Sequence, residues 1–390
     1  MTRYEELDSL RGIAALIVLI GHYMMVFPAY ESYQYDLNSP WIVYFVKETP
    51  IRMFLSSGNE SVILFFVLSG FVLYISIIND KFHYATYLIK RICRIYVPYL
   101  VAIIIAVSVK MLLSHNDLPV ISNWFSKSWT AAETPGLLLQ HLFFIGQYNT
   151  NAYNNVIWSL VHEMRISILF PLLIILFIRK KLKHSLLYFM VFTFSSTMGL
   201  YLFGSGMKQT SILLSFHYMT IFLMGALLAK YRQVLFDHAL KMKKNLKNIL
   251  LMIAMICFLY EGIIGDIDFL NNYIFRDYVV SCGVCILLLM SVSLRTFSSI
   301  LKFRVLTLLG KISYSLYLYH LIVLFSFMYL FYDKLPTIVI LILSFLFSIL
   351  LASSAYLFVE KPCINLGHYL TKRGKLEYSS KVPESRPLTK

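Results

Sequence analysis

Long apolar runs recur along this chain, and they constrain its fold more than any other feature. A helix rises about 1.5 Å per residue, so about 20 mostly apolar residues are needed to cross the roughly 30 Å hydrocarbon core of a bilayer. Ten runs approach that length, and we expect a membrane span near each of them: 10–29, 61–79, 95–113, 156–178, 185–203, 210–229, 248–265, 275–294, 309–331 and 336–359. The sequence therefore predicts an all-α fold, a polytopic membrane bundle of about ten transmembrane helices.

The composition agrees with lipid as the solvent. Hydrophobic residues make up 58% of the 390 positions and charged residues only 14%, which leaves too thin a polar coat for a soluble protein of this size. We expect one transmembrane domain over residues 1–370. The polar segment 371–390, which contains Pro383 and Pro387, is predicted to be a disordered cytoplasmic tail. The run from Leu137 to Gly146 is too short to cross and is expected to form an interfacial or re-entrant helix.

The basic residues indicate the orientation of the bundle. The formal net charge is +15, but the lysines and arginines sit in short loops between apolar runs, so we expect contact with anionic lipid headgroups and no nucleic-acid partner. With the N-terminus inside, 26 of the 35 lysines and arginines fall on the cytoplasmic side. The positive-inside rule therefore places both termini in the cytoplasm.

Two ionisable residues of the first span share one helix face. Arg11 and His22 are eleven residues apart; at about 100° per residue they return to nearly the same face, about 16 Å apart along the axis. Arg11 would then offer a cation at the cytoplasmic surface, and His22 a titratable base near the middle of the membrane. The alternative is a topology arginine and a histidine bonded to a neighbouring helix. The residues alone do not favour either interpretation.

A second basic cluster precedes the third span. Arg91 and Arg94 are three residues apart, so they share a helix face. Their guanidinium groups suit phosphate binding, although anchoring at the cytoplasmic surface explains them equally well.

Ionisable residues also occur in later spans, where each is costly and needs an explanation. Glu163, next to His162, could orient a histidine or bind a sugar hydroxyl, or it could pair with Arg165. His320 follows a run of serines and tyrosines, so its helix is expected to line a polar cavity. His217 is expected to make a structural interhelical bond.

No metal site is predicted. Cys282 and Cys285 form a CxxC pair inside an apolar run, but a structural zinc site needs further ligands, so we expect these side chains to pack.

Several motifs appear together in a characteristic order. They are Leu-Asp-Ser-Leu-Arg-Gly-Ile-Ala-Ala at 7–15 with His22, Phe-Phe-Val-Leu-Ser-Gly-Phe at 65–71, Lys90-Arg91-x-x-Arg94, Trp158-Ser159-Leu160 with Glu163, Ile-Ser-Tyr-Ser-Leu-Tyr-Leu-x-His at 312–320, and Val-Glu-Lys-Pro at 359–362. Over nearly the whole chain, this order resembles the acyltransferase 3 family of membrane O-acyltransferases that modify surface glycans.

The resemblance implies a donor, a site and an acceptor. The donor is an acyl-CoA, usually acetyl-CoA, taken from the cytoplasm, and the acceptor is a hydroxyl, most often on a surface or lipid-linked glycan. Carried over by position, Arg11 and His22 are the catalytic pair, with Glu163 and His320 as further catalytic candidates. The candidates for donor binding are Arg91, Arg94 and Ser69.

The chemistry of the transfer remains open at this stage. His22 could act as a base that deprotonates the acceptor hydroxyl or as a nucleophile that holds the acyl group. A bundle of ten spans with polar interior residues would also suit an exporter of a lipid-linked glycan or small molecule. Exporters often contain repeated halves, and no such internal symmetry is present.

The charge distribution yields a test of orientation. In a background without native cysteines, a cysteine replacing Lys243 should react with a membrane-impermeant probe only from the cytoplasmic side. A cysteine replacing Asn123 should react from outside in intact cells. Labelling of position 123 only after the membrane has been opened would reverse the orientation.

Overall fold

The computed structural model describes most of the 390-residue chain: residues 4–31, 41–78, 82–113, 118, 121–129, 134–143, 146–178, 180–264 and 272–381. Every regular element within these residues is a helix. The predicted all-α fold class is therefore confirmed.

Nine segments of the described chain are long and apolar enough to cross a bilayer. Seven of them are single helices: α1 (Glu5–Met24), α5 (Gly58–Ile77), α10 (Ile157–Ile178), α11 (Leu182–Phe203), α12 (Ile212–Lys230), α16 (Tyr273–Ser293) and α18 (Arg304–Phe331). The other two contain one π-helical turn each. One consists of α6 (Tyr84–Arg91), the turn η1 (Ile92–Tyr96) and α7 (Val97–Leu113). The other consists of α19 (Thr337–Ala355), the turn η3 (Tyr356–Glu360) and α20 (Lys361–Lys381). Helix α20 thus continues into the segment predicted to be a tail, and residues 382–390 lie outside the described residues.

The expected span over 248–265 is not one continuous helix. The chain forms α14 (Lys244–Phe258), breaks at Leu259 and continues as the short α15 (Tyr260–Ile264). Gly262 of α15 packs closely on α4 (Ile51–Ser56), since a Cβ there would lie 2.8 Å from Cα of Met53. The run predicted as one span near 248–265 thus consists of two consecutive helices, because hydropathy does not report where a helix is interrupted.

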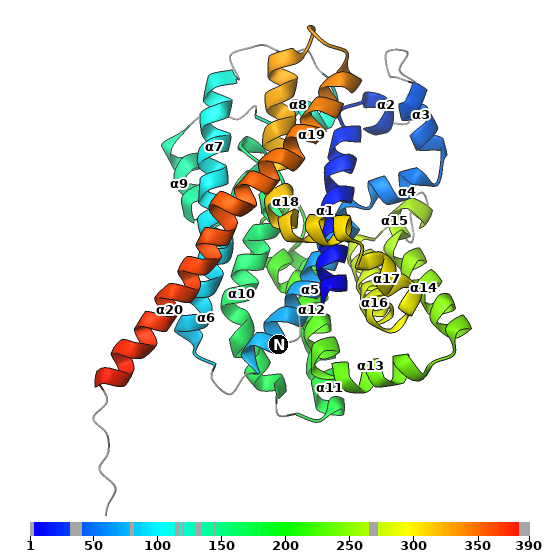
Figure 1. The fold of residues 1–390 in the computed structure, drawn as a ribbon, viewed down its shortest axis with the longest axis vertical. Helices are drawn as coiled ribbons and strands as arrows, with labels where there is room; N and C mark the ends of the chain where they lie inside the picture. Colours follow the sequence, from blue (N-terminus) through cyan, green and yellow to red (C-terminus); the bar gives the residue numbers. More distant parts are fainter. Residues whose placement is uncertain are drawn as a thin grey trace, which may run out of the picture.

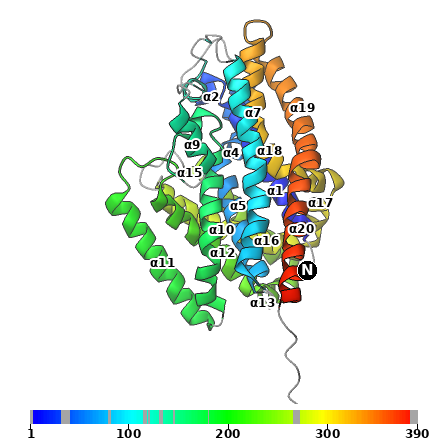
Figure 2. The ribbon, with the colours of Figure 1, turned by 90° about the vertical axis from the view of Figure 1, so that its left-hand side faces the viewer.

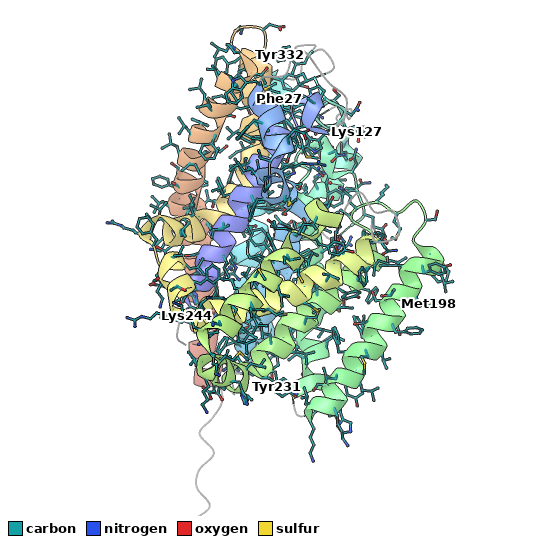
Figure 3. The ribbon with its side chains drawn as sticks, turned by 90° about the vertical axis from the view of Figure 1, so that its right-hand side faces the viewer. Phe27, Lys127, Met198, Tyr231, Lys244 and Tyr332 are labelled. Carbon is teal, nitrogen blue, oxygen red and sulfur yellow. The ribbon has the colours of Figure 1, made fainter. Side chains whose placement is uncertain are left out.

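The two ends of the bundle are easily distinguished. Helix α1 begins and α20 ends at one end, here called the lower end, where α13 (Arg232–Lys241) also lies (Figure 1). The opposite, upper end carries α2 (Pro28–Glu31), α8 (Asn123–Ser126) and the turn between α18 and α19. The positive-inside count assigns Lys244 to the cytoplasmic side and Lys127 to the outside. Lys244 lies at the lower end and Lys127 at the upper end (Figure 3). The remaining short helices are α3 (Trp41–Glu48), α9 (Pro135–Phe143), η2 (Thr150–Ala152) and α17 (Arg295–Leu301).

Helix α11 stands apart from the other long helices (Figure 2). Only 11% of the residues in its most apolar stretch are buried, whereas 78% are buried in the corresponding stretch of α5. Large side chains such as Phe194 and Met198 are exposed along it (Figure 3). An apolar helix with so little protein contact suits a lipid-facing position.

Glycines permit the closest helix contacts at the centre of the bundle. A Cβ on Gly12 of α1 would lie 2.6 Å from the backbone nitrogen of Gly310 in α18, and a Cβ on Gly310 would collide with the carbonyl oxygen of Asp8. In the same way, a Cβ on Gly70 of α5 would collide with the backbone of α12, and a Cβ on Gly225 of α12 would collide with the backbone of α5. Small residues allow helix backbones to approach closely in lipid, where van der Waals packing drives association. These contacts fix α1 against α18 and α5 against α12.

We expect Gly310→Ala to lower the melting temperature of the purified protein in detergent. The added methyl group would meet the backbone of α1, and overpacking of this kind costs about 1–3 kcal/mol. Gly136→Ala is the matched control, because a Cβ at Gly136 meets nothing within 4 Å. Equal melting temperatures for the two variants would show that the α1–α18 contact is not tight.

Candidate functional site

A cavity of about 560 Å³ lies between the helices that carry most of the polar motifs. Its walls come from α1, α5, α6, η1, α10, α18, η3 and the beginning of α20. Along α5 the lining residues extend from Val62 to Ser76, which corresponds to about 21 Å of helix. The cavity is therefore a long shaft, roughly parallel to the spans.

Cations dominate the lower part of this cavity. The basic lining residues are Arg11, Arg91, Arg94, Lys311 and Lys361, and the acidic ones are Asp8, Glu163 and Glu360. The guanidinium of Arg11 lies 3.7 Å from the carboxylate of Asp8. Five cations against three carboxylates leave a net positive lining, which favours an anionic ligand.

Two π-helical turns shape the wall around these cations. Turn η1 (Ile92–Tyr96) connects α6 to α7, and Arg91 and Arg94 both reach the cavity from this region. Turn η3 brings Glu360 to the cavity, where its carboxylate accepts a hydrogen bond of 2.7 Å from Ser315. The hydroxyl of Tyr314 donates to the carbonyl of Ile95 at 2.8 Å. Both turns are thereby joined to α18, and π-helical turns occur frequently at functional sites.

Glu163 and Ser69 meet in the middle of the cavity. The hydroxyl of Ser69 donates to Oε1 of Glu163 at 3.0 Å, which links α5 to α10. Both residues line the cavity. The sequence analysis named Ser69 and Glu163 as separate candidates, and only the fold reveals that they are hydrogen-bonded to each other.

The upper end of the cavity is closed by an aromatic and hydroxyl cluster. The hydroxyl of Tyr317 lies 2.7 Å from that of Ser159, and both hydroxyls are within hydrogen-bond distance of the Val156 carbonyl. The ring of Phe65 packs edge-on against Tyr317 at a centroid distance of 5.7 Å. All three residues that contribute side chains to this cluster line the cavity.

One helical turn above Tyr317, two histidines form a hydrogen-bonded pair. Nδ1 of His22 lies 3.0 Å from Nε2 of His320, and the two ring centroids are 5.2 Å apart, so the rings meet edge to edge. The ring of His22 also lies nearly parallel to that of Trp124 of α8, with the centroids 5.3 Å apart. His320 is fully buried and His22 is half-buried. Neither histidine is among the residues that line the cavity.

The hydrogen bonds of the neutral histidine pair determine its tautomers. A carbonyl oxygen only accepts, so the 3.0 Å contact between His320 Nδ1 and the Leu316 carbonyl requires a proton on that nitrogen. Nε2 of His320 is then an acceptor, and His22 Nδ1–H donates to it. This arrangement leaves the proton-free lone pair on His22 Nε2, which no residue in the described part of the chain hydrogen-bonds. His320 thus fixes the orientation of the His22 ring and leaves its Nε2 without a proton.

The predicted site residues fall into two groups. Arg11, Arg91, Arg94, Ser69 and Glu163 line the cavity, whereas His22 and His320 lie above it. Arg11 and His22, expected to act as a pair, are on the same helix but belong to different parts of the site. His22 does bond a neighbouring helix, but its partner is a second histidine.

Other ionisable residues of the spans have structural roles. His162 contacts the Ser215 hydroxyl and the Gln209 carbonyl, each at 2.8 Å. Arg165 donates to the carbonyls of Thr210 and Gly146, so it ties together two loops and does not pair with Glu163. The predicted interhelical bond of His217 is confirmed: its Nε2 lies 3.0 Å from the carboxylate of Asp277 on α16.

Sequence reasoning missed several residues of the site. Tyr317 and Ser159 belong to recognised motifs but carried no separate signal. Trp124 lies in a short helix between spans, and nothing in its surroundings predicts contact with His22. Among the described residues, no cluster of three or more histidines, cysteines or acids is suited to a metal ion, and the five cysteines are free.

Comparison with known proteins identifies the family. The acyltransferase 3 family, described as an acyltransferase domain, matches residues 4–357. No curated protein and no solved structure matches the chain. The match spans the helices that contain the cavity and the histidine pair except α20 and most of η3. Together with the apolar helices it indicates a multi-pass membrane protein. The chain belongs to the acyltransferase 3 family and is a membrane acyltransferase.

Proposed function

We propose that the protein moves an acyl group, most simply acetyl, from cytoplasmic acyl-CoA to a hydroxyl of a surface or lipid-linked glycan. The observation that carries this proposal is a cation-lined cavity that leads toward a histidine with a free, oriented Nε2. The lower part of the cavity would hold the charged end of the donor. Its upper, less polar part would take the thioester.

The lower cations suit the phosphates of CoA. Arg91, Arg94 and Lys311 approach the cavity from two different helices, so they can neutralise a multiply charged ligand from more than one side. Arginine binds phosphate oxygens through two parallel N–H groups, which fixes orientation as well as charge.

His22 would carry the proton in the transfer step. As a base, Nε2 takes the proton of the acceptor hydroxyl, the oxygen forms a bond to the thioester carbonyl carbon, and the carbon–sulfur bond breaks. The CoA thiolate that leaves then receives a proton. As a nucleophile, Nε2 would instead bond to the carbonyl carbon first, and the carbon–sulfur bond would break to release the CoA thiolate. In a second step the hydroxyl oxygen would bond to that carbon, the bond to Nε2 would break, and the hydroxyl proton would pass to the thiolate.

The surroundings of His22 suit either route. When Nε2 gains a proton or an acyl group, the ring becomes cationic, and its Nδ1–H still donates to His320. The parallel face of Trp124 also favours a cation, since a desolvated cation–π contact contributes about 2 kcal/mol. Water exclusion by the closed upper end of the cavity would limit hydrolysis of the thioester.

The role of His22 can be tested with His22→Ala in purified, reconstituted protein. We expect acyl transfer to fall by about 10²- to 10⁴-fold or more, with donor binding and melting temperature close to those of the wild type. His320→Ala should lower turnover by a smaller factor and leave the KM for acyl-CoA unchanged, because His320 only orients His22.

His217→Asn provides the control for a buried structural histidine, and it should change stability without changing activity per folded molecule. Near-normal activity of folded His22→Ala protein would exclude the catalytic assignment.

The donor end of the site can be tested independently at Arg94. We expect Arg94→Ala to raise the KM for acyl-CoA by about tenfold, because a charge-assisted hydrogen bond contributes about 1.5–3 kcal/mol. Arg94→Lys should recover only part of the affinity, since the planar fork is lost. Arg304→Ala, an exposed arginine that does not line the cavity, should leave KM unchanged. If Arg94→Ala also leaves KM unchanged, this arginine serves only to anchor the helix at the membrane surface.

A further inference from the structure

Of the side chains at the upper end of the cavity, that of Tyr317 lies next to the histidine pair. Helix α18 contributes Tyr314 and then Tyr317 to the cavity wall, and His320 follows one turn later. The ring of Tyr317 lies 6.2 Å from that of His320. A donor that reaches the upper end of the cavity therefore meets Tyr317 before it meets the histidine pair.

Tyr317 is held firmly in this position. Only 5% of its surface is exposed. Its hydroxyl, that of Ser159 and the Val156 carbonyl form a small network in which two protons are shared among three oxygens. Phe65 supports the ring from α5. Three different spans thus fix the tyrosine at the end of the cavity.

This position has a consequence for the acyl group. Transfer requires the thioester carbonyl to come within about 3–3.5 Å of the attacking atom, so the carbonyl must pass the level at which the ring of Tyr317 now lies. The ring must turn aside, and the space that it vacates is the space available to the acyl chain. Phe65 and Ser159 border that space from the other two helices, so it cannot extend sideways without further repacking.

We propose that Tyr317, positioned by Ser159 and Phe65, limits the length of the acyl group and restricts the donor to short-chain acyl-CoA. This inference rests on the proposed function, since it concerns which donor the same site accepts. The class of substrate follows from size: Phe65 and Ser159 border the ring, so an acyl chain longer than the space that the ring vacates would clash with the surrounding spans.

The test compares acyl-CoA donors of two, four, six and eight carbons with the same purified protein and acceptor membranes. In the wild type we expect kcat/KM to fall steeply with the length of the acyl chain. Once the chain exceeds the available space, each added methylene should lower kcat/KM by roughly tenfold. Tyr317→Ala removes the ring, so we expect the ratio of six-carbon to two-carbon kcat/KM to rise by about tenfold or more. A purely structural tyrosine would lower activity with all donors alike and leave this ratio unchanged.

Three further variants make the result specific. Tyr317→Phe keeps the ring and loses the hydroxyl, so it should retain the wild-type length ratio. Tyr356→Ala removes a tyrosine that also lines the cavity but belongs to η3; whatever its effect on rate, its length ratio should stay at the wild-type value. Phe65→Leu opens the same end of the cavity from α5 and should shift the ratio in the same direction as Tyr317→Ala, even if the alanine variant does not fold.

The outcomes separate this inference from the proposed function. If the wild type transfers the acetyl group but both Tyr317→Ala and Phe65→Leu keep its length ratio, the length limit is wrong and the acyltransferase assignment stands. If the wild type uses no acyl-CoA of any length, the proposed function fails, and the length limit fails with it. A wild type that prefers eight carbons to two would also overturn the inference.

Discussion

The close crossing of α1 and α18 is the contact on which the rest of the site depends. At Gly12 and Gly310 the two backbones approach so closely that neither position has room for a Cβ. The approach sets the distance between the helices over the next turns, where His22 and His320 meet at 3.0 Å. In lipid, helices gain little from burying apolar surface against one another, so close packing and interhelical hydrogen bonds must hold such a pair. Here both act on the same two helices.

The charged residues and the histidine pair lie in two different regions of the site. The lower region holds five cations close to where the charged residues of the chain concentrate, and its upper limit is formed by rings and hydroxyls. Charged groups are expensive in the middle of a membrane, so the anionic donor that we propose would be held near the surface, and only its reactive end would enter the interior. His22, whose Nε2 has no hydrogen-bond partner among the described residues, lies above this upper limit, away from the cations. This division follows from the cost of desolvating charge.

Part of this arrangement could be predicted from the sequence and part could not. Nine of the ten apolar runs coincide with segments of the described chain that are long enough to cross a bilayer. The motifs singled out five residues that line the cavity. The break at Leu259 and the contact between Trp124 and His22 were not predictable, because each depends on a neighbour distant in sequence. Histidines in spans illustrate the same limit. His162, His217 and His320 look alike in the sequence, yet two of them fasten helices or loops and only one orients a second histidine.

The sequence by itself determined which segments enter the membrane, since the cost of placing polar residues in hydrocarbon acts on each run independently. It also determined, through its ordered motifs, the acyltransferase family. The tertiary structure alone decided that His22 faces His320 from 298 residues away, that Leu316 fixes the tautomers of both rings, and that Tyr317, at the upper end of the cavity, lies next to the histidine pair. The physical reason is that hydrogen bonds and ring contacts are short-ranged. They exist only where helix packing brings distant parts of the chain within a few ångströms, and apolar periodicity carries no information about that packing.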